Sequence, residues 1–111
     1  MSIFSFAQDE DETVFVRKAP FRMILARARG VVPNPEDLDR LQLAEEFDSL
    51  AFWRLDPADR DRLGHAVMTA TEQLRRQIAG GEQIEEPVLP DIDDKLREVI
   101  ELFMRHLEPA A

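Results

Sequence analysis

The residues best suited to metal or acid–base chemistry are two histidines, and their spacing fits none of the common metal motifs. His65 and His106 fall in separate predicted helices, without the Glu-x-x-His or His-Glu-x-x-His spacing of di-iron and zinc-protease sites. His106 lies close to the predicted end of its helix, where the helix dipole favours a cation. We interpret both histidines as structural, because lone histidines titrate or cap more often than they ligate.

Clustered carboxylates are the second candidate for chemistry. The "DIDD" at 91–94 resembles the start of a calcium loop, but its sixth residue is Leu96 instead of the required glycine. Because this stretch runs directly into a predicted helix, we interpret it as a helix cap. The pairs Glu45-Glu46 and Glu85-Glu86 could exchange protons, but neither has a nucleophile or metal ligand beside it. We assign both pairs to solvated faces.

Motifs for nucleophilic and cofactor chemistry are missing from the sequence. It has no cysteine, no glycine-rich phosphate loop, no Gly-x-Ser-x-Gly elbow and no dinucleotide fingerprint. We therefore predict a protein that is not an enzyme, with no cofactor, no metal and no small-molecule substrate. The enzymatic alternative is a pocket between helices in which scattered polar residues converge.

Composition predicts a single acidic domain over residues 1–111. The net charge is −9 and the pI is about 4.6, so the surface repels nucleic acid and anionic lipid. No apolar run approaches the roughly 20 residues that span a bilayer. The opening "MSIFSFAQDEDE" lacks the basic start of a secretory signal, and the lack of cysteine suits a reducing compartment. We expect a cytoplasmic protein that binds neither membranes nor nucleic acid.

Helical periodicity dominates the chain and predicts a mainly α fold. Residues 1–18 are either a short hairpin, with "SIFSFA" and "TVFV" joined by the acidic "QDEDE", or an extended arm. Residues 20–107 form the helical core, with expected helices at 20–29, from 35 to about 50 or 53, at 57–79, and at 92–107.

Single apolar stripes on these helices must pack together, so we predict a small four-helix bundle-like domain. The second helix is expected to bury its stripe at Leu38, Leu41, Ala44, Phe47 and Leu50. Gly64 in the third helix is expected to permit a close helix crossing, since it has no side chain.

The stretch "LAFWRL" carries two adjacent aromatic residues. Phe52 and Trp53 would point about 100° apart on a regular helix, so both cannot occupy the centre of one stripe. Either the helix ends here and both rings close the core, or one ring is exposed and anchors a partner.

The stretch "RKAPFRMILARARG" at 17–30 carries five positive charges in an acidic protein. Arg22 and Arg29 are predicted at the edge of the apolar stripe, with Arg27 pointing elsewhere. We interpret this helix as an electrostatic counterpart of carboxylates in the same chain or a second subunit. The "QDEDE" turn and the last helix are the expected sources of those carboxylates.

These observations favour a non-catalytic acidic helical protein that acts through protein–protein interaction, as a homodimer. The predicted protein-binding residues are Arg22, Arg29, Phe52 and Trp53. The partner is a second copy of the chain or another protein. The alternative is an immunity- or inhibitor-type protein whose negative charge masks a basic active site.

Overall fold

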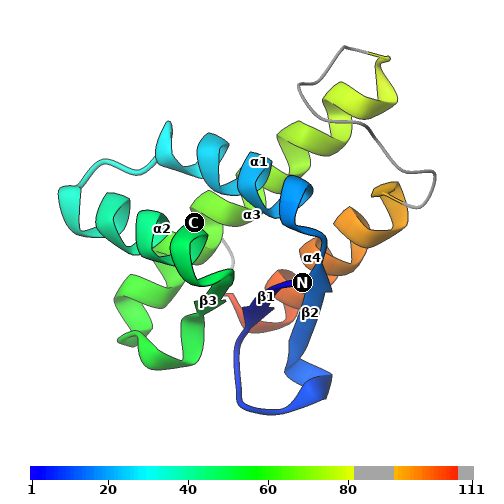
Figure 1. Cartoon of the computed structure of the whole chain (residues 1–111). Helices are drawn as coiled ribbons and strands as arrows, with labels where there is room; N and C mark the ends of the chain where they lie inside the picture. The colour runs from blue at the N-terminus through cyan, green and yellow to red at the C-terminus, as the bar shows by residue number, and fades with distance from the viewer. Residues whose placement is uncertain (82–91, 108–111) are drawn as a thin grey trace.

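The computed structural model describes residues 1–81 and 92–107 and contains four α-helices and one small sheet in that part (Figure 1). In chain order the elements are β1 (Ser2–Ser5), the 3₁₀ helix η1 (Glu10–Glu12), β2 (Thr13–Val16), α1 (Lys18–Arg29), α2 (Pro35–Phe47), β3 (Ser49–Ala51), the 3₁₀ helix η2 (Phe52–Arg54), α3 (Pro57–Ala79) and α4 (Ile92–His106). The mainly helical prediction is confirmed. A four-helix bundle is not, because a sheet packs against one side of the helices.

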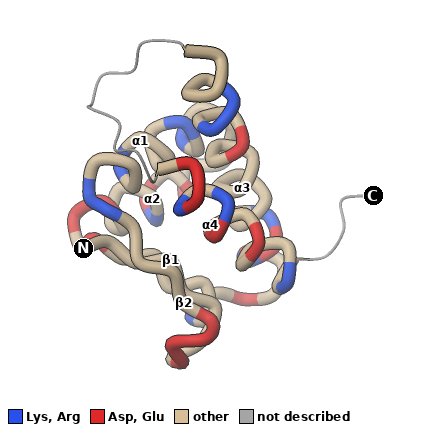
Figure 2. The backbone as a smooth tube through the Cα atoms, turned by 90° about the vertical axis from the view of Figure 1, so that its right-hand side faces the viewer, with Lys and Arg blue, Asp and Glu red and all other residues tan. Residues whose placement is uncertain are grey.

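The N-terminal segment forms the hairpin and not the extended arm. β1 and β2 pair antiparallel, with Phe4 opposite Val14, and the Phe6 N–H donates to the Glu12 carbonyl at 2.9 Å. The Thr13 hydroxyl donates to the Asp9 carbonyl at 2.8 Å, which closes the acidic turn. Figure 2 shows this turn at the far end of the hairpin from the start of α1.

A third strand, which the sequence did not predict, completes the sheet. β3 pairs in parallel with β1, so the strand order is β2-β1-β3 and β1 lies in the centre. Residues alternate between the two faces of a strand. Phe4, Val14 and Leu50 lie side by side on the buried inner face, while Ile3 and Ser49 lie on the outer face.

The inner face of the sheet packs on an aromatic cluster. Phe52 stacks on Phe6 with ring centroids 4.7 Å apart, and Phe103 meets Phe52 edge-on at 5.1 Å. Phe4 contacts Phe103 at 5.5 Å and Phe21 at 4.8 Å, which joins the sheet to α4 and α1. Behind this cluster α3 packs against both α1 and α4, and α2 packs against α1.

The predicted extent of the second helix was wrong. α2 ends at Phe47, and Asp48 adopts a left-handed conformation with φ 54° while its N–H donates to the Ala44 carbonyl. Aspartate tolerates this region better than most residues. The Asp48 carbonyl accepts from the Ile3 N–H at 3.0 Å, so strand pairing with β1 replaces the next helical turn.

The predicted apolar stripe of this helix was also wrong in part. Leu41 and Ala44 are buried, and Leu50 is buried from a strand instead of a helix. Leu38 and Phe47 are exposed, with Phe47 at 74%. The charged Asp37 takes an inward position that periodicity alone would give to an apolar residue.

The remaining helix boundaries agree closely with the sequence. α1 begins at Lys18, two residues before the expected Pro20, and α3 runs over the predicted 57–79. A Cβ placed on Gly64 would lie 2.5 Å from Leu107 Cδ2, so the missing side chain makes room for the side chain of Leu107, the residue after α4. The pair Glu85-Glu86 and the proposed cap Asp91 lie outside the described residues.

Candidate protein-binding face

The outer face of the sheet is lined by small residues and remains open. The strand register brings Ser5 next to Thr13 and Ala51, and it brings Ile3 next to Phe15 and Ser49. The short side chains of Ser5, Thr13, Ser49 and Ala51 form the floor of a groove of about 670 Å³, which Ile3 also lines. Larger residues from α2 and η2 form its walls, and we call this feature the outer groove. Its lining residues are Ile3, Ser5, Ala7, Gln8, Thr13, Arg40, Leu43, Ala44, Phe47, Ser49, Leu50, Ala51, Trp53, Arg54 and Leu55.

Exposed apolar side chains border this groove. Leu43 and Phe47 are 51% and 74% exposed and lie four residues apart, so they share one side of α2. Trp53 of η2 is half-buried among the lining residues, and Phe15 is 42% exposed on the same face of the sheet. Exposed apolar side chains gathered at one groove are typical of interaction sites.

Two arginines are among the residues that line the groove. Arg54 lies over the Trp53 ring, with its guanidinium carbon 4.9 Å from the ring centroid. Arg40 is held by Asp37 at 2.8 Å and Asp59 at 3.3 Å. Among the described residues that line the groove there is no carboxylate and no histidine. The groove therefore suits contact with apolar and acidic groups better than proton transfer.

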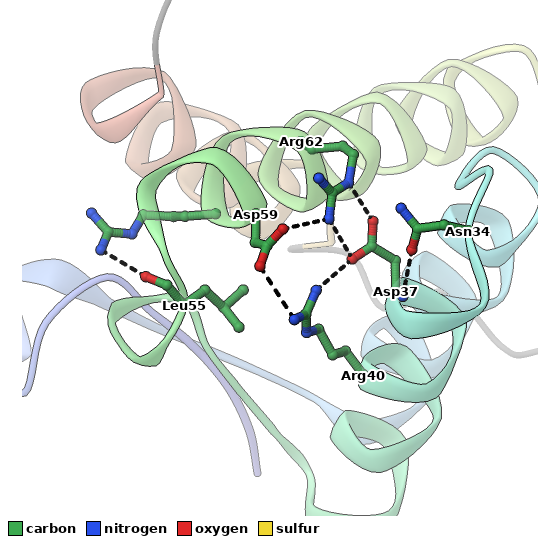
Figure 3. A network of polar contacts seen from close by, with 7 residues as sticks. Asn34, Asp37, Arg40, Leu55, Asp59 and Arg62 are labelled. Carbon is green, nitrogen blue, oxygen red and sulfur yellow. Dashed lines mark hydrogen bonds and ion pairs between the residues drawn. The ribbon is translucent and has the colours of Figure 1, made fainter.

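The wall formed by α2 is fixed to α3 by a polar network centred on Asp37 (Figure 3). The buried Asp37 carboxylate accepts from Arg62 Nε at 2.7 Å and Nη2 at 3.1 Å, and Arg62 also reaches Asp59 at 2.7 Å. The hydrogen bond from Arg62 holds the pKa of the Asp37 carboxyl below its usual value, and the contact with Arg40 adds to this. Asn34 caps the helix by accepting from the Asp37 N–H at 2.9 Å.

Sequence reasoning missed this network, although a signal for it was present. "DLDR" at 37–40 and "DRDR" at 59–62 place an aspartate and an arginine three residues apart in both helices. Each spacing gives an ion pair along one helix, Asp37 with Arg40 and Asp59 with Arg62. Two such pairs on facing helices can join into one network, which is the observed arrangement.

The four predicted protein-binding residues do not come together in one site. Phe52 is fully buried in the aromatic cluster, whereas the next residue, Trp53, lines the outer groove. Arg22 and Arg29 border a separate depression between α1 and α2, beside Gln42, Glu45 and Glu46. Each alternative for "LAFWRL" therefore describes one of the two rings: Phe52 lies in the core, and Trp53 is partly exposed.

The ion pairs of the basic helix differ from the expected ones. Arg29 pairs with Glu45 at 3.0 Å and Lys18 with Asp48 at 3.8 Å, so these carboxylates come from α2 and its C-cap. Arg27, which was predicted to point away from the stripe, donates to Gln77 of α3. The expected pairing of this helix with the "QDEDE" turn is replaced because α2 lies directly against α1.

The acidic turn instead contacts the end of α4. Glu12 pairs with His106 and lies 3.8 Å from Arg105, and the bond from His106 lowers the pKa of the Glu12 carboxyl. The His106 ring also stacks on Phe6 with centroids 4.6 Å apart. His65 lies 3.5 Å from Asp61 in its own helix. These contacts fit the structural interpretation of both histidines.

Within residues 1–81 and 92–107, no group of three or more histidine, aspartate or glutamate residues could hold a metal ion. In the same ranges no helix is long and apolar enough to cross a lipid bilayer. No protein-family model matches the chain, and no curated protein or solved structure is significantly similar to it.

Proposed function

We propose that this protein acts by binding protein through the outer groove, and that it is not a catalyst. The observation that carries the proposal is the exposure of Leu43, Phe47 and Trp53 around a groove with a floor of small residues. Burying these side chains in a complex would remove apolar surface from water at about 25 cal/mol per Å².

The chemistry of the groove supports binding over catalysis. In the part of the chain that the structure describes, its polar lining consists of hydroxyls, one glutamine and two arginines, and no carboxylate or histidine lines it beside those hydroxyls. Arg40 is already held by two carboxylates, so it has little freedom to serve a substrate. Tryptophan and arginine are also the residue types most enriched at interface hot spots, and Trp53 and Arg54 supply both.

Affinity capture with matched variants tests this proposal. The variant Leu43→Glu/Phe47→Glu places two charges on the groove. The control Val31→Glu/Met104→Glu places the same charges on two exposed apolar positions, 46% and 66% exposed, that do not line the groove. Tagged protein is mixed with untagged chain and with extract of the source cells, and the retained proteins are quantified.

We expect wild type and control to retain at least one protein in stoichiometric amount, and the groove variant to lose about ten-fold or more of it. Circular dichroism verifies that all three proteins are folded. If no retained protein depends on the groove, the proposal is wrong. A basic partner that binds the groove variant as well as it binds wild type, and that is released by salt, would instead favour the inhibitor-type alternative.

A further inference from the structure

We infer that the occupant of the outer groove is a second copy of this chain, bound about a two-fold axis with the Phe47 ring of each copy in the groove of the other. This inference rests on the proposed function and names its partner. In such an isologous contact the same patch of both subunits must be self-complementary.

The shape of the face meets this condition. Phe47 is a protruding ring, 74% exposed, at the C-terminal end of α2. The groove beside it has a floor of Ser5, Thr13 and Ala51, whose side chains are too short to fill it. A projection and a recess therefore occur on one face, which allows two copies to exchange equivalent contacts.

Local charge on this face also suits a second copy, although each copy has a net charge of −9. Among the described residues that line the groove there are two arginines and no carboxylate, and Arg40 is already paired with Asp37 and Asp59. Arg54 is therefore the charge on the groove that a second copy has to match. Asp39 lies four residues before Leu43 and shares its side of α2. Its side chain is exposed, as is that of Arg54, which contacts only the Trp53 ring among the interactions found in the described residues.

Seating α2 of one copy against η2 of the other would bring Asp39 toward the partner copy's Arg54. The two-fold axis repeats that pair, so one dimer holds it twice. Leu43 and Phe47 would then cover the Trp53 ring, which is the apolar centre expected of an interface. Opposite charges at the rim would fix the register of the two copies.

Light scattering coupled to size exclusion, over a concentration series, tests the dimer. We expect wild type to be dimeric and Phe47→Glu to raise the dissociation constant about thirty-fold or more, with unchanged far-ultraviolet circular dichroism. Met104→Glu, which adds the same charge on α4, should leave the dimer intact. A wild type that is monomeric throughout the series, or a dimer that persists in Phe47→Glu, would overturn the inference.

A charge exchange tests the register separately. Arg54→Glu and Asp39→Arg should each weaken self-association about ten-fold, because each places like charges opposite one another twice. Mixing the two variants should restore a heterodimer, since the introduced glutamate then faces the introduced arginine and the unchanged Asp39 faces the unchanged Arg54. Failure of the mixture to associate would contradict this seating. A monomer that still captures another protein through the groove would overturn the inference and leave the proposed function standing.

Discussion

Phe52 and Trp53 are adjacent in the chain and lie in opposite surroundings. Phe52 has no exposed surface and contacts Phe6 and Phe103, whereas Trp53 is half-buried in the wall of the outer groove. The short strand β3 and the turn η2 direct one ring inward and the next outward. Two neighbouring aromatic residues can therefore differ in role, one serving the core and the other, in the proposed function, serving recognition.

The two faces of the sheet repeat this contrast. The inner face presents Phe4, Val14 and Leu50, which are all buried, and the outer face presents Ser5, Thr13 and Ala51 in the neighbouring row. Antiparallel sheets commonly pack one face on the core and leave the other to solvent. Here the open face carries small residues, and larger apolar residues such as Leu43, Phe47 and Trp53 surround them. The space above the small residues is therefore a groove.

The largest expected effect comes from removing the buried ring of Phe52. Phe52→Ala should lower the free energy of unfolding by about 3–5 kcal/mol, because it leaves a cavity beside the Phe6 and Phe103 rings. Trp53→Ala should cost about 1 kcal/mol or less in folding while weakening self-association. Urea denaturation of both variants at low protein concentration measures the two values. Equal losses of unfolding free energy in the two variants would show that Phe52 and Trp53 contribute equally to the stability of the fold.

Charged groups show the same contrast between buried and exposed positions. Asp37 is fully buried and bound by two arginines, so Asp37→Asn should cost about 2 kcal/mol of stability. This is below the roughly 3–5 kcal/mol of a fully buried pair, since both arginines remain partly exposed. Asp59→Asn, at a position with 24% side-chain exposure, is the matched control and should cost clearly less.

The dependence on pH identifies the cause of the Asp37 effect. Its pKa is lower in the folded chain than the usual aspartate value of about 3.9, so its contribution is present above that value. It is lost as the pH falls through the lowered folded-state pKa. The gap between wild type and Asp37→Asn should therefore narrow below about pH 4. A gap that stays constant in acid would assign the loss to packing instead of charge.

Helix positions could be predicted from sequence because caps and periodicity are local. Pro35 and Pro57 each open a helix after a polar residue, and both helices begin there. β3 could not be predicted, because Ser49–Ala51 pairs with β1, whose residues lie far away in the chain. The groove depends on that pairing, so Phe47 in its wall was predicted as part of a buried stripe, and Leu43 was given no role.

The smallest expected effect concerns Arg22 and Arg29 of α1, for which the sequence analysis predicted the same role. Arg29 pairs with Glu45 at 3.0 Å, and both side chains are about one-third exposed, whereas the exposed Arg22 has no ion pair among the described residues. Arg29→Glu should therefore lower the free energy of unfolding by about 0.5–1 kcal/mol, and Arg22→Glu by less. The Arg29→Glu deficit should shrink in added salt, because screening acts over about 10 Å at 0.1 M. Thermal denaturation at low and high ionic strength measures both. An equal, salt-insensitive loss in the two variants would mean that this helix is held by packing on α2 and α3 and that its charges do not contribute.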